Sequence, residues 1–366
     1  MDKAIVVQKF GGSSVADPAK LGRVADRVAE TVKGGRRVVV VVSAMGKTTD
    51  ELLALARSVA ASPPRRELDM LLSTGERISM ALLAMALETR GVDAISFTGS
   101  QSGILTNDRH SGARIIEVRP VRIEDELSRD KVVIVAGFQG MSYKREITTL
   151  GRGGSDTTAV ALAAALGADC EIYSDVDGVY SADPRIVPAA QHLPRLGYDE
   201  MQELAEHGAK VLNAQAVEWA KKARITIHAR ATAGSDKETL VSGEGASGRV
   251  VTGTRRLQRA TGEVWKILEE ERIALRAAGR ACVRFSRDDV PDWPRIEKRM
   301  LDAGAQLAEE GSVTAVGPGL GSDAAFVRRA LALPHHDFCA SPLSLTLYLE
   351  PERVDEVTRS LHDMIR

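Results

Sequence analysis

Hydrophobic residues in the first part of the chain repeat with the periods of buried strands and amphipathic helices. Residues 4–7 (AIVV) form a short apolar run, which is typical of a buried parallel strand. From residue 18, apolar side chains follow helical spacing up to the glycine pair at 34–35, and residues 38–42 form a second apolar run. A strand, a glycine loop, a helix and a second strand make a βαβ unit. The pattern therefore predicts an α/β fold with a mostly parallel sheet, whose loops gather at one edge.

The same alternation of strands and helices continues to about residue 230. Helices are predicted over 67–90 (interrupted at 73–76), 199–208 and 211–221, and strands over 94–97, 132–136, 171–173 and, as the last strand, 226–229. Residues 242–249 (SGEGASGR) have the composition of a linker. We therefore expect one domain over residues 1–245 and a smaller α+β region over 250–366.

Within the smaller region the pattern is clear only in parts. Strands are predicted over 281–285, 313–316 and 344–349, and helices over 293–301, 323–332 and 354–364. The stretch 255–310 as a whole is rich in charge and harder to interpret.

Charge and cysteine content narrow the class of protein. Among 366 residues, 49 Lys and Arg balance 50 Asp and Glu, which argues against a nucleic-acid or membrane surface as partner. The three cysteines lie far apart and the histidines lack metal-ligand spacing, so neither disulfides nor a protein-held metal is expected. No apolar run is expected to reach the length of a membrane span. We therefore expect a soluble, cytoplasmic protein that acts on small molecules.

Residues 148–166 (TTLGRGGSDTTAVALAAAL) join a glycine-rich turn to an apolar helical segment. Such a turn presents free backbone N–H groups at the positive end of the helix dipole, which favours anionic oxygens. Arg152 adds a planar donor, and Asp156 adds a carboxylate that could face a metal or a cation. A polar loop ahead of a buried helix is the alternative interpretation.

Two further glycine segments imitate nucleotide-binding motifs without completing them. Gly46-Lys47-Thr48 matches the end of a P-loop, but Val41 stands where that motif needs glycine. Residues 317–321 (GPGLG) follow a predicted strand, but Ser322 replaces the third glycine of a dinucleotide fingerprint. We expect both segments to be ordinary turns.

The charged residues at the predicted strand ends favour phosphoryl transfer. Lys9 and Arg152 supply cations, and Glu76 and Asp156 supply carboxylates. Phosphoryl transfer needs cations near the moving charge, donors on the phosphate oxygens and a metal bridging the nucleotide phosphates. No activated nucleophile is evident in the sequence. Direct transfer from ATP to a small acceptor therefore fits these residue types best.

Five stretches together resemble the aspartate kinases, in the order in which that family carries them. The resemblance covers roughly the first two-thirds of the chain. The stretches are residues 9–14 (KFGGSS), 43–53 (SAMGKTTDELL), 73–79 (STGERIS), 149–158 (TLGRGGSDTT) and 173–185 (YSDVDGVYSADPR). Other kinases that share the sheet are not expected to show all five. The resemblance implies the amino-acid-kinase fold and the phosphorylation of L-aspartate by ATP, with Mg²⁺, to 4-phospho-L-aspartate.

The resemblance also implies roles for particular residues. Lys9 would stabilise the transferring phosphoryl group, and Asp156 would orient Lys9 or the metal shell. Glu76 would bind the substrate ammonium and Arg152 a carboxylate. The full aspartate site would comprise Thr48, Glu76, Phe138, Arg152 and Ser155. The ATP site would comprise Lys9, Gly11, Gly12, Ser13, Asp175, Tyr180, Arg185 and Lys210.

Some of these assignments have simpler alternatives. Tyr180 could be a packing residue, Phe138 a wall of the site and Arg185 a surface arginine. The acceptor could be another amino-acid carboxylate, such as glutamate. A non-catalytic regulatory subunit is the other alternative, although such a protein should have lost Lys9 or Asp156. The pathway that the product enters stays open.

The C-terminal region departs from the family pattern. Aspartate kinases usually end in two ACT modules, which bind lysine or threonine and build dimers. Residues 311–366 resemble a shortened second module, whereas residues 255–310 lack the family's effector-loop sequences where the first should stand. We therefore expect weakened lysine or threonine feedback and a homodimer formed through this degenerate ACT-like region.

Overall fold

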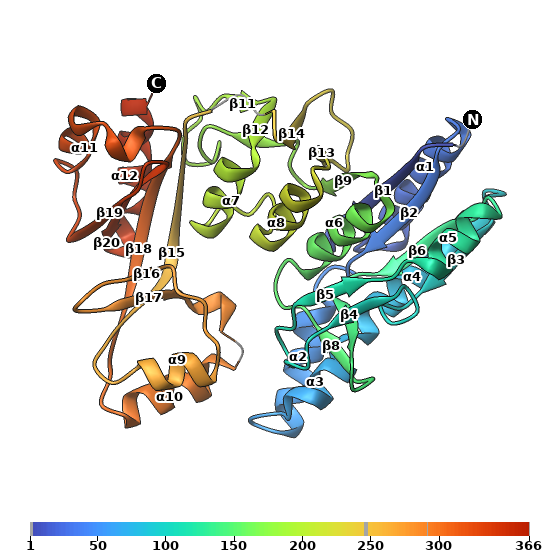
Figure 1. Ribbon diagram of the computed structural model, residues 1–366, viewed down its shortest axis with the longest axis horizontal. Coiled ribbons are helices and arrows are strands. Elements are labelled where there is room, and N and C mark those ends of the chain that lie inside the picture. The colour runs from blue at the N-terminus through green and yellow to red at the C-terminus, as the bar shows by residue number, and fades with distance from the viewer. Residues whose placement is uncertain (1–2, 245–247, 291, 366) are drawn as a thin grey trace. The chain divides into compact units, whose positions relative to one another are not determined.

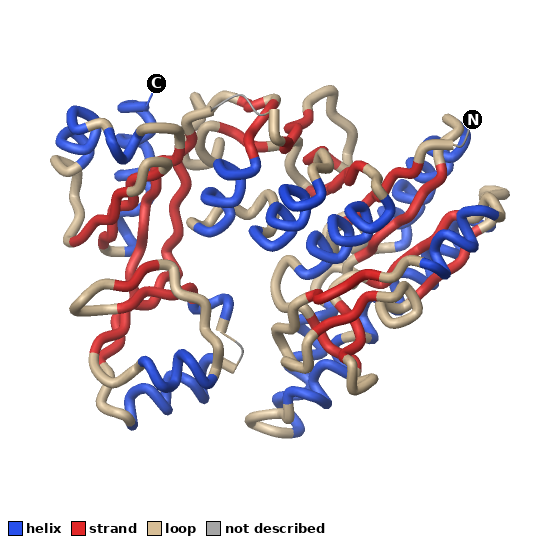
Figure 2. The backbone as a smooth tube through the Cα atoms, in the orientation of Figure 1, coloured by secondary structure: helices blue, strands red, loops and turns tan. Residues whose placement is uncertain are grey.

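The computed structural model describes residues 3–244, 248–290 and 292–365 (Figures 1 and 2). The chain folds into two compact units. Unit 1 comprises Met1–Val179 and Val211–Gly245, and unit 2 comprises Tyr180–Lys210 and Ala246–Arg366. The predicted linker 242–249 lies partly outside the described residues, at 245–247. The division into domains 1–245 and 250–366 stays a proposal, and the structure groups Tyr180–Lys210 with unit 2.

A mostly parallel sheet forms the centre of unit 1. The strands that unit 1 contributes to it follow the order β14-β13-β9-β1-β2-β6-β3, and only β14 runs antiparallel to its neighbour in this series. The bounds are β1 (Ile5–Phe10), β2 (Arg37–Val42), β3 (Ala94–Phe97), β6 (Val132–Ala136), β9 (Asp169–Ser174), β13 (Ile227–Ala231) and β14 (Glu238–Ser242). The predicted α/β fold is confirmed. The expectation that 226–229 is the last strand of this sheet is wrong, because β14 pairs with β13.

Helices cover both faces of this sheet, which explains why its central strands are continuous runs of apolar residues. The helices of unit 1 are α1 (Pro18–Lys33), α2 (Thr48–Val59), α3 (Arg65–Leu72), α4 (Thr74–Glu88), α5 (Val121–Ser128), α6 (Gly154–Leu166) and α8 (Ala214–Ala223). Helices α1 and α4 share one hydrophobic cluster with Phe10 and its neighbours on that face. Because side chains alternate along a strand, Lys9 points to the opposite face from Phe10, where α6 lies.

A small four-stranded sheet carries the chain into α6. Its order is β5-β4-β7-β8, with β4 (Ile104–Thr106), β5 (Ile115–Val118), β7 (Gln139–Ser142) and β8 (Ile147–Thr149). These strands have three or four residues each, which is too short for a periodic sequence signal. Strand β8 ends just before the glycine-rich turn, so this sheet fixes where that turn begins.

One stretch of unit 1 is apolar and long enough to cross a membrane. Among the described residues, Arg65–Glu88 meets this test with 24 residues, contrary to the expectation that no apolar run approaches that length. A core helix of a soluble protein meets the same test, and the stretch is divided into α3 and α4. Because α4 contributes Leu83 and Leu87 to the core cluster, we regard this as weak evidence for a membrane span.

Unit 2 is built on a six-stranded antiparallel sheet of order β16-β17-β15-β18-β20-β19. Two long strands pair along most of their lengths and pass through two hydrophobic clusters, one with α9 and α10 and one with α11 and α12 (Figure 1). The strands are β15 (Val250–Thr261), β16 (Ala277–Ala278), β17 (Val283–Ser286), β18 (Gln306–Val316), β19 (Asp337–Ala340) and β20 (Ser344–Leu349). The helices are α9 (Trp265–Glu270), α10 (Trp293–Asp302), α11 (Ala324–Ala330) and α12 (Val354–Ile365).

The charge-rich stretch 255–310 is therefore an ordered α+β module that shares two strands with the module after it. Strand β15 was not predicted, and β18 begins seven residues before the predicted 313–316. The remaining short elements are β10 (Val179–Tyr180), β11 (His192–Leu193), β12 (Arg195–Gly197) and α7 (Tyr198–Glu206), with single turns η1 (Arg287–Asp289), η2 (Leu320–Ser322) and η3 (Pro351–Arg353).

Candidate active site

Lys9 and Asp156 form a buried ion pair at the carboxyl edge of the parallel sheet. Lys9 lies near the end of β1, and Asp156 lies in the first turn of α6. The Lys9 Nζ and Asp156 Oδ1 atoms are 2.7 Å apart, and only 11% and 13% of the two side chains is exposed. Within the described part of the chain, no donor is aligned to hydrogen-bond this Oδ1 atom. The contact is therefore a close ion pair that does not have hydrogen-bond geometry.

The glycine turn after β1 is locked to the loop after β2. Gly46 donates a backbone hydrogen bond to the Gly12 carbonyl at 3.0 Å, and Gly11 donates to the Tyr173 carbonyl at 3.2 Å. A Cβ atom at Gly12 would lie 2.8 Å from the Ala44 carbonyl oxygen, so only glycine fits there. Ser13 next to them is exposed. The turn thus holds backbone groups in fixed positions beside Lys9.

Glu76 brings a buried carboxylate to the same edge. It lies in the first turn of α4, is 3% exposed, and accepts a hydrogen bond from the Ala44 backbone N–H at 3.2 Å. Its Oε2 atom has no hydrogen-bond partner among the described residues. Burial raises the pKa of Glu76 to about 7, against smaller lowering contributions from the backbone hydrogen bonds. A cationic group placed at Oε2 would restore the ordinary ionisation of this carboxylate.

Thr48 lies close to Gly75, the residue before Glu76. A Cβ atom at Gly75 would lie 2.8 Å from the Ala44 Cβ atom and 3.6 Å from the Thr48 Cγ2 atom. The half-buried Thr48 starts α2, and its hydroxyl donates to the Met45 carbonyl at 2.7 Å. The loop after β2 thus contacts both the glycine turn after β1, through Gly46, and the carboxylate of Glu76, through Ala44.

Phe138 and Ser155 lie where β6 ends and α6 begins. Phe138 has a left-handed backbone (φ 69°), which is costly for a bulky residue, and its N–H donates to the Thr158 hydroxyl at 3.2 Å. Ser155 is 7% exposed, and a Cβ atom at Gly137 would lie 2.7 Å from its Oγ atom. Side chain and backbone are therefore packed tightly at this end of the sheet.

Arg152 is exposed in the loop formed by residues 150–154, which we call the Arg152 loop. Its backbone carbonyl accepts a hydrogen bond from Asn213 Nδ2 at 3.0 Å. Asn213 also caps α8 by accepting from Gln215 N–H at 2.9 Å. Sequence reasoning missed Asn213. An asparagine immediately before an amphipathic helix is a signal for a helix cap, but nothing in the sequence indicated that Asn213 contacts the Arg152 backbone.

Asp69 is a second residue that sequence reasoning missed, and it contacts the other end of the Arg152 loop. It is fully buried on α3 and accepts a hydrogen bond from the Thr149 hydroxyl at 2.6 Å. The Nδ1 atom of His110 lies 2.8 Å from its Oδ2 atom, and the Ser111 N–H donates to its Oδ1 atom at 3.0 Å. Burial raises the pKa of Asp69, while the Thr149 and His110 contacts lower it.

The predicted nucleotide residues are divided between the two units. Asp175 is exposed in unit 1, directly after β9. In unit 2, the Tyr180 ring meets His192 edge to face at 5.3 Å, Arg185 forms an exposed ion pair with Asp183 at 2.6 Å, and Lys210 is exposed. Their joint role in binding a nucleotide stays a prediction.

Comparison with known proteins identifies the family of the chain. The family model described as the amino acid kinase family matches residues 4–230. The chain belongs to this family. Aspartokinases from Mycolicibacterium smegmatis and Corynebacterium glutamicum are 58% and 57% identical to it over 242 residues, which are 66% of this chain. The chain spans 58% of the length of these relatives.

Two solved structures extend the likeness beyond the residues matched by the family model. Escherichia coli aspartokinase III in complex with aspartate and ADP has a TM-score of 0.85 at 25% identity, covering 99% of both chains. Aspartate kinase from Synechocystis has a TM-score of 0.61 at 32% identity, covering 99% of this chain and 69% of that one. The architecture of unit 2 is thus similar to a part of E. coli aspartokinase III as well.

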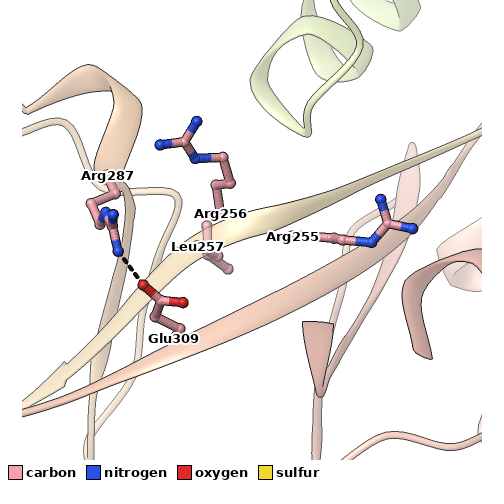
Figure 3. A pocket seen from close by; sticks show the side chains of 5 residues that line it. All are labelled: Arg255, Arg256, Leu257, Arg287 and Glu309. Carbon is pink, nitrogen blue, oxygen red and sulfur yellow. Dashed lines mark hydrogen bonds and ion pairs between the residues drawn. The ribbon is translucent and has the colours of Figure 1, made fainter. Parts of the chain in front are cut away.

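A pocket of ≈ 400 Å³ lies in unit 2 and is lined by residues outside the range that the family model matches (Figure 3). It is lined by Arg255, Arg256, Leu257, Arg287 and Glu309, where a bulge interrupts the pairing of β15 with β18. Every arginine has an acidic partner: Arg255 pairs with Asp355 at 2.5 Å, Arg256 with Asp288 at 3.0 Å, and Arg287 with Glu309. The pocket is therefore close to neutral despite its arginines.

Proposed function

We propose that this chain is an aspartate kinase, which transfers the γ-phosphoryl group of ATP to the side-chain carboxylate of L-aspartate and forms 4-phospho-L-aspartate. The observation that carries the proposal is the buried Glu76 carboxylate with its unpartnered Oε2 atom, at the same sheet edge as the Lys9–Asp156 pair. An unpaired buried carboxylate is costly, so it implies a ligand with a cationic group. The aspartate and ADP bound by E. coli aspartokinase III support this choice of substrates.

Glu76 would bind the ammonium group of L-aspartate, and Arg152 would bind its α-carboxylate. A charged hydrogen bond from the ammonium would satisfy Oε2 and stabilise the ionised form of Glu76. The planar guanidinium of Arg152 suits a carboxylate because it donates two parallel hydrogen bonds. Thr48, Phe138 and Ser155 would then line the space for the side chain that reacts.

Lys9 would act on the group that moves. A side-chain carboxylate oxygen of aspartate attacks the γ-phosphorus, a new O–P bond forms, and the bond to the bridging β,γ-oxygen breaks as ADP leaves. The acceptor is already an anion, so no general base is needed, and positioning with charge neutralisation supplies the catalysis. The Lys9 ammonium, held 2.7 Å from Asp156, would stabilise the negative charge on the transferring oxygens.

The turn formed by Gly11, Gly12 and Ser13 would hold phosphate oxygens through the backbone N–H groups of Gly12 and Ser13, because the Gly11 N–H already donates to the Tyr173 carbonyl. Glycine at position 12 lets this turn pack against the Ala44 carbonyl, which supports a fixed position for these N–H groups. Asp175, Tyr180, Arg185 and Lys210 would contact the rest of the nucleotide. The ADP in the E. coli complex supports a nucleotide substrate.

Mg²⁺ would be held largely by the nucleotide. No group of three or more His, Cys, Asp and Glu side chains is arranged to hold a metal in the described part of the chain. The residues present therefore fit an ion that keeps its waters and binds phosphate oxygens, which is the usual preference of Mg²⁺. When bound, it would neutralise phosphate charge. Asp156 is the carboxylate nearest to Lys9 and would contribute to its outer shell.

A direct assay tests this function. The purified chain is supplied with ATP and Mg²⁺ and with L-aspartate, L-glutamate or no acid, and ADP release is coupled to NADH oxidation. Hydroxylamine then traps the acyl phosphate as a hydroxamate. We expect turnover and hydroxamate with L-aspartate well above the other two. Turnover with glutamate alone would favour a kinase for another amino acid, and no turnover with any acid would favour a regulatory subunit.

We further propose a cytoplasmic homodimer with weakened lysine and threonine feedback, formed through the ACT-like region. The effector-loop sequences missing from residues 255–310 support the weak feedback. Lysine and threonine at millimolar concentration should leave the rate nearly unchanged in the same assay, and strong inhibition would exclude the idea. Sedimentation with and without residues 250–366 would test the dimer.

A further inference from the structure

Apart from Thr149, the polar cluster around Asp69 lies outside the motifs that the proposed function uses. Asp69 is fully buried on α3, yet its carboxylate is contacted by the Thr149 hydroxyl, by His110 Nδ1 and by the Ser111 N–H, at 2.6, 2.8 and 3.0 Å. Ser111 has a left-handed backbone (φ 62°), so the chain turns sharply where His110 and Ser111 contact Asp69. A buried carboxylate with this many donors holds several segments in one arrangement.

The segments that meet at Asp69 have one neighbour in common, the Arg152 loop. Thr149 is the last residue of β8, and its backbone carbonyl accepts from the Ala113 N–H at 2.8 Å. The next residue, Leu150, donates its N–H to the Phe138 carbonyl at 2.9 Å. The start of the loop is therefore fixed by both the side chain and the backbone of Thr149.

The end of the loop is fixed separately. Asn213 donates to the Arg152 carbonyl at 3.0 Å, and it crowds Gly153, whose left-handed φ of 70° needs glycine there. With Asp69 before the loop and Asn213 after it, the exposed Arg152 side chain extends from a backbone that is tied at both sides. The glycines in between give the loop no stiffness of their own.

We propose that Asp69 and Thr149 are positioning residues, which hold the Arg152 loop so that its guanidinium meets the α-carboxylate of the amino-acid substrate. This inference rests on the proposed function, because that function assigns Arg152 to the carboxylate. Loss of the Asp69–Thr149 contact then loosens the grip on the amino acid while the phosphoryl-transfer pair Lys9–Asp156 stays in place. The signature is a higher KM for L-aspartate with little change in kcat.

The chain offers a matched control in the adjacent residue. Thr148 is also fully buried in β8, and its hydroxyl lies 2.6 Å from that of Thr106, away from Asp69. Thr148→Val and Thr149→Val therefore delete the same group from neighbouring positions of one strand. Thr149→Ser keeps the hydroxyl and serves as the rescue variant. Asp69→Asn removes the charge, but it carries more risk for folding, so the threonine variants decide.

The test combines kinetics with hydrogen exchange of the backbone amides in residues 150–155. For Thr149→Val we expect KM for L-aspartate to rise about tenfold, kcat and KM for ATP to stay within about twofold, and loop amides to exchange faster. Thr148→Val and Thr149→Ser should resemble the wild type. Equal effects of the two valine variants, or faster exchange without a change in KM, would overturn the proposal. If the wild type phosphorylates no amino acid, the proposed function fails, whereas the exchange comparison still judges whether Thr149 orders the loop.

Discussion

Two groups of buried charges, one in each unit, differ in how completely they are paired. In the sheet of unit 2, Glu310 is 3% exposed and is contacted by Arg284 Nε at 2.7 Å, His336 Nε2 at 2.9 Å and Arg259 Nε at 3.2 Å. Arg284 also pairs with Asp337 at 2.8 Å and stacks over the Tyr348 ring at 3.9 Å. The charged groups of this cluster are paired with one another, so the cluster holds neighbouring strands together.

The charged residues at the sheet edge of unit 1 retain hydrogen-bonding atoms that are not yet satisfied. The Glu76 Oε2 atom has no hydrogen-bond partner in the described residues, and Lys9 has an ion pair that lacks hydrogen-bond alignment. Burial without full pairing costs stability, and such a cost is typical of sites that complete their contacts with a ligand. The comparison teaches that the degree of pairing, more than burial or charge, separates the candidate site from a structural cluster.

Replacement of Lys9 should give the largest effect, and the effect should be on catalysis. In Lys9→Met, kcat should fall by about 10²–10³-fold because the charge on the transferring phosphoryl group loses its stabilising cation. Lys3→Met is the control, since Lys3 forms an exposed ion pair with Asp130 at 2.7 Å. Steady-state rates with L-aspartate and ATP measure both variants. Unchanged kcat in Lys9→Met would remove the distinction between the two kinds of buried charge.

Replacement of Arg284 should have the opposite profile. Arg284→Met leaves Glu310 buried with fewer donors, so the free energy of unfolding should fall by about 3 kcal/mol, at the low end for a broken buried pair. Urea unfolding followed by circular dichroism measures the loss. The kcat at a temperature where the variant is folded should match the wild type. A large fall in kcat with unchanged stability would mean that the cluster is functional as well.

Glu76 should reveal itself through pH. Its pKa of about 7 in the folded chain lies above the ordinary value of 4.5, so the native state holds a proton that the unfolded state has released between these two values. The free energy of unfolding should therefore fall as the pH rises through this window, by at most about 3 kcal/mol, and level off above pH 7. Glu76→Gln removes this contribution, as urea unfolding at pH 5 and pH 7.5 would show.

L-aspartate should reverse the pH effect of Glu76. The substrate ammonium favours the ionised carboxylate, so binding near pH 6.5 should release a proton, which calorimetry in buffers of different ionisation enthalpy detects. If wild type and Glu76→Gln show the same pH slope and the same proton release, Glu76 is not the group that waits for a cation.

The sequence correctly predicts those parts of the molecule in which buried residues are apolar and exposed residues are polar. The valine runs of β1, β2 and β6 are buried on both faces, so a simple apolar pattern locates them. Strand β15 was missed because Arg255, Arg256 and Arg259 suggest a solvated segment, whereas in the fold each of them has an acidic partner. Charges that are paired across strands cannot be located from the local pattern, because their partners lie far along the chain.

The candidate site follows the same division. Motifs placed Lys9, Glu76 and Asp156 at strand ends and helix starts, where the structure has them. The raised pKa of Glu76 depends on what surrounds it, and the support from Asp69 depends on Thr149, 80 residues away in sequence. Such long-range contacts leave no periodic trace, so the sequence identifies the reacting groups better than the groups that hold them.

Replacement of Arg185 should give the smallest effect. It extends the comparison of buried charges to a charge that is almost fully exposed. Arg185 is 87% exposed in its ion pair with Asp183, and exposed pairs contribute little to stability. Arg185→Ala should therefore leave the melting temperature unchanged. If Arg185 contacts the nucleotide, KM for ATP should rise severalfold while KM for L-aspartate stays constant, and Arg195→Ala, at another exposed arginine of unit 2, should change neither. An unchanged KM for ATP would make Arg185 a surface arginine.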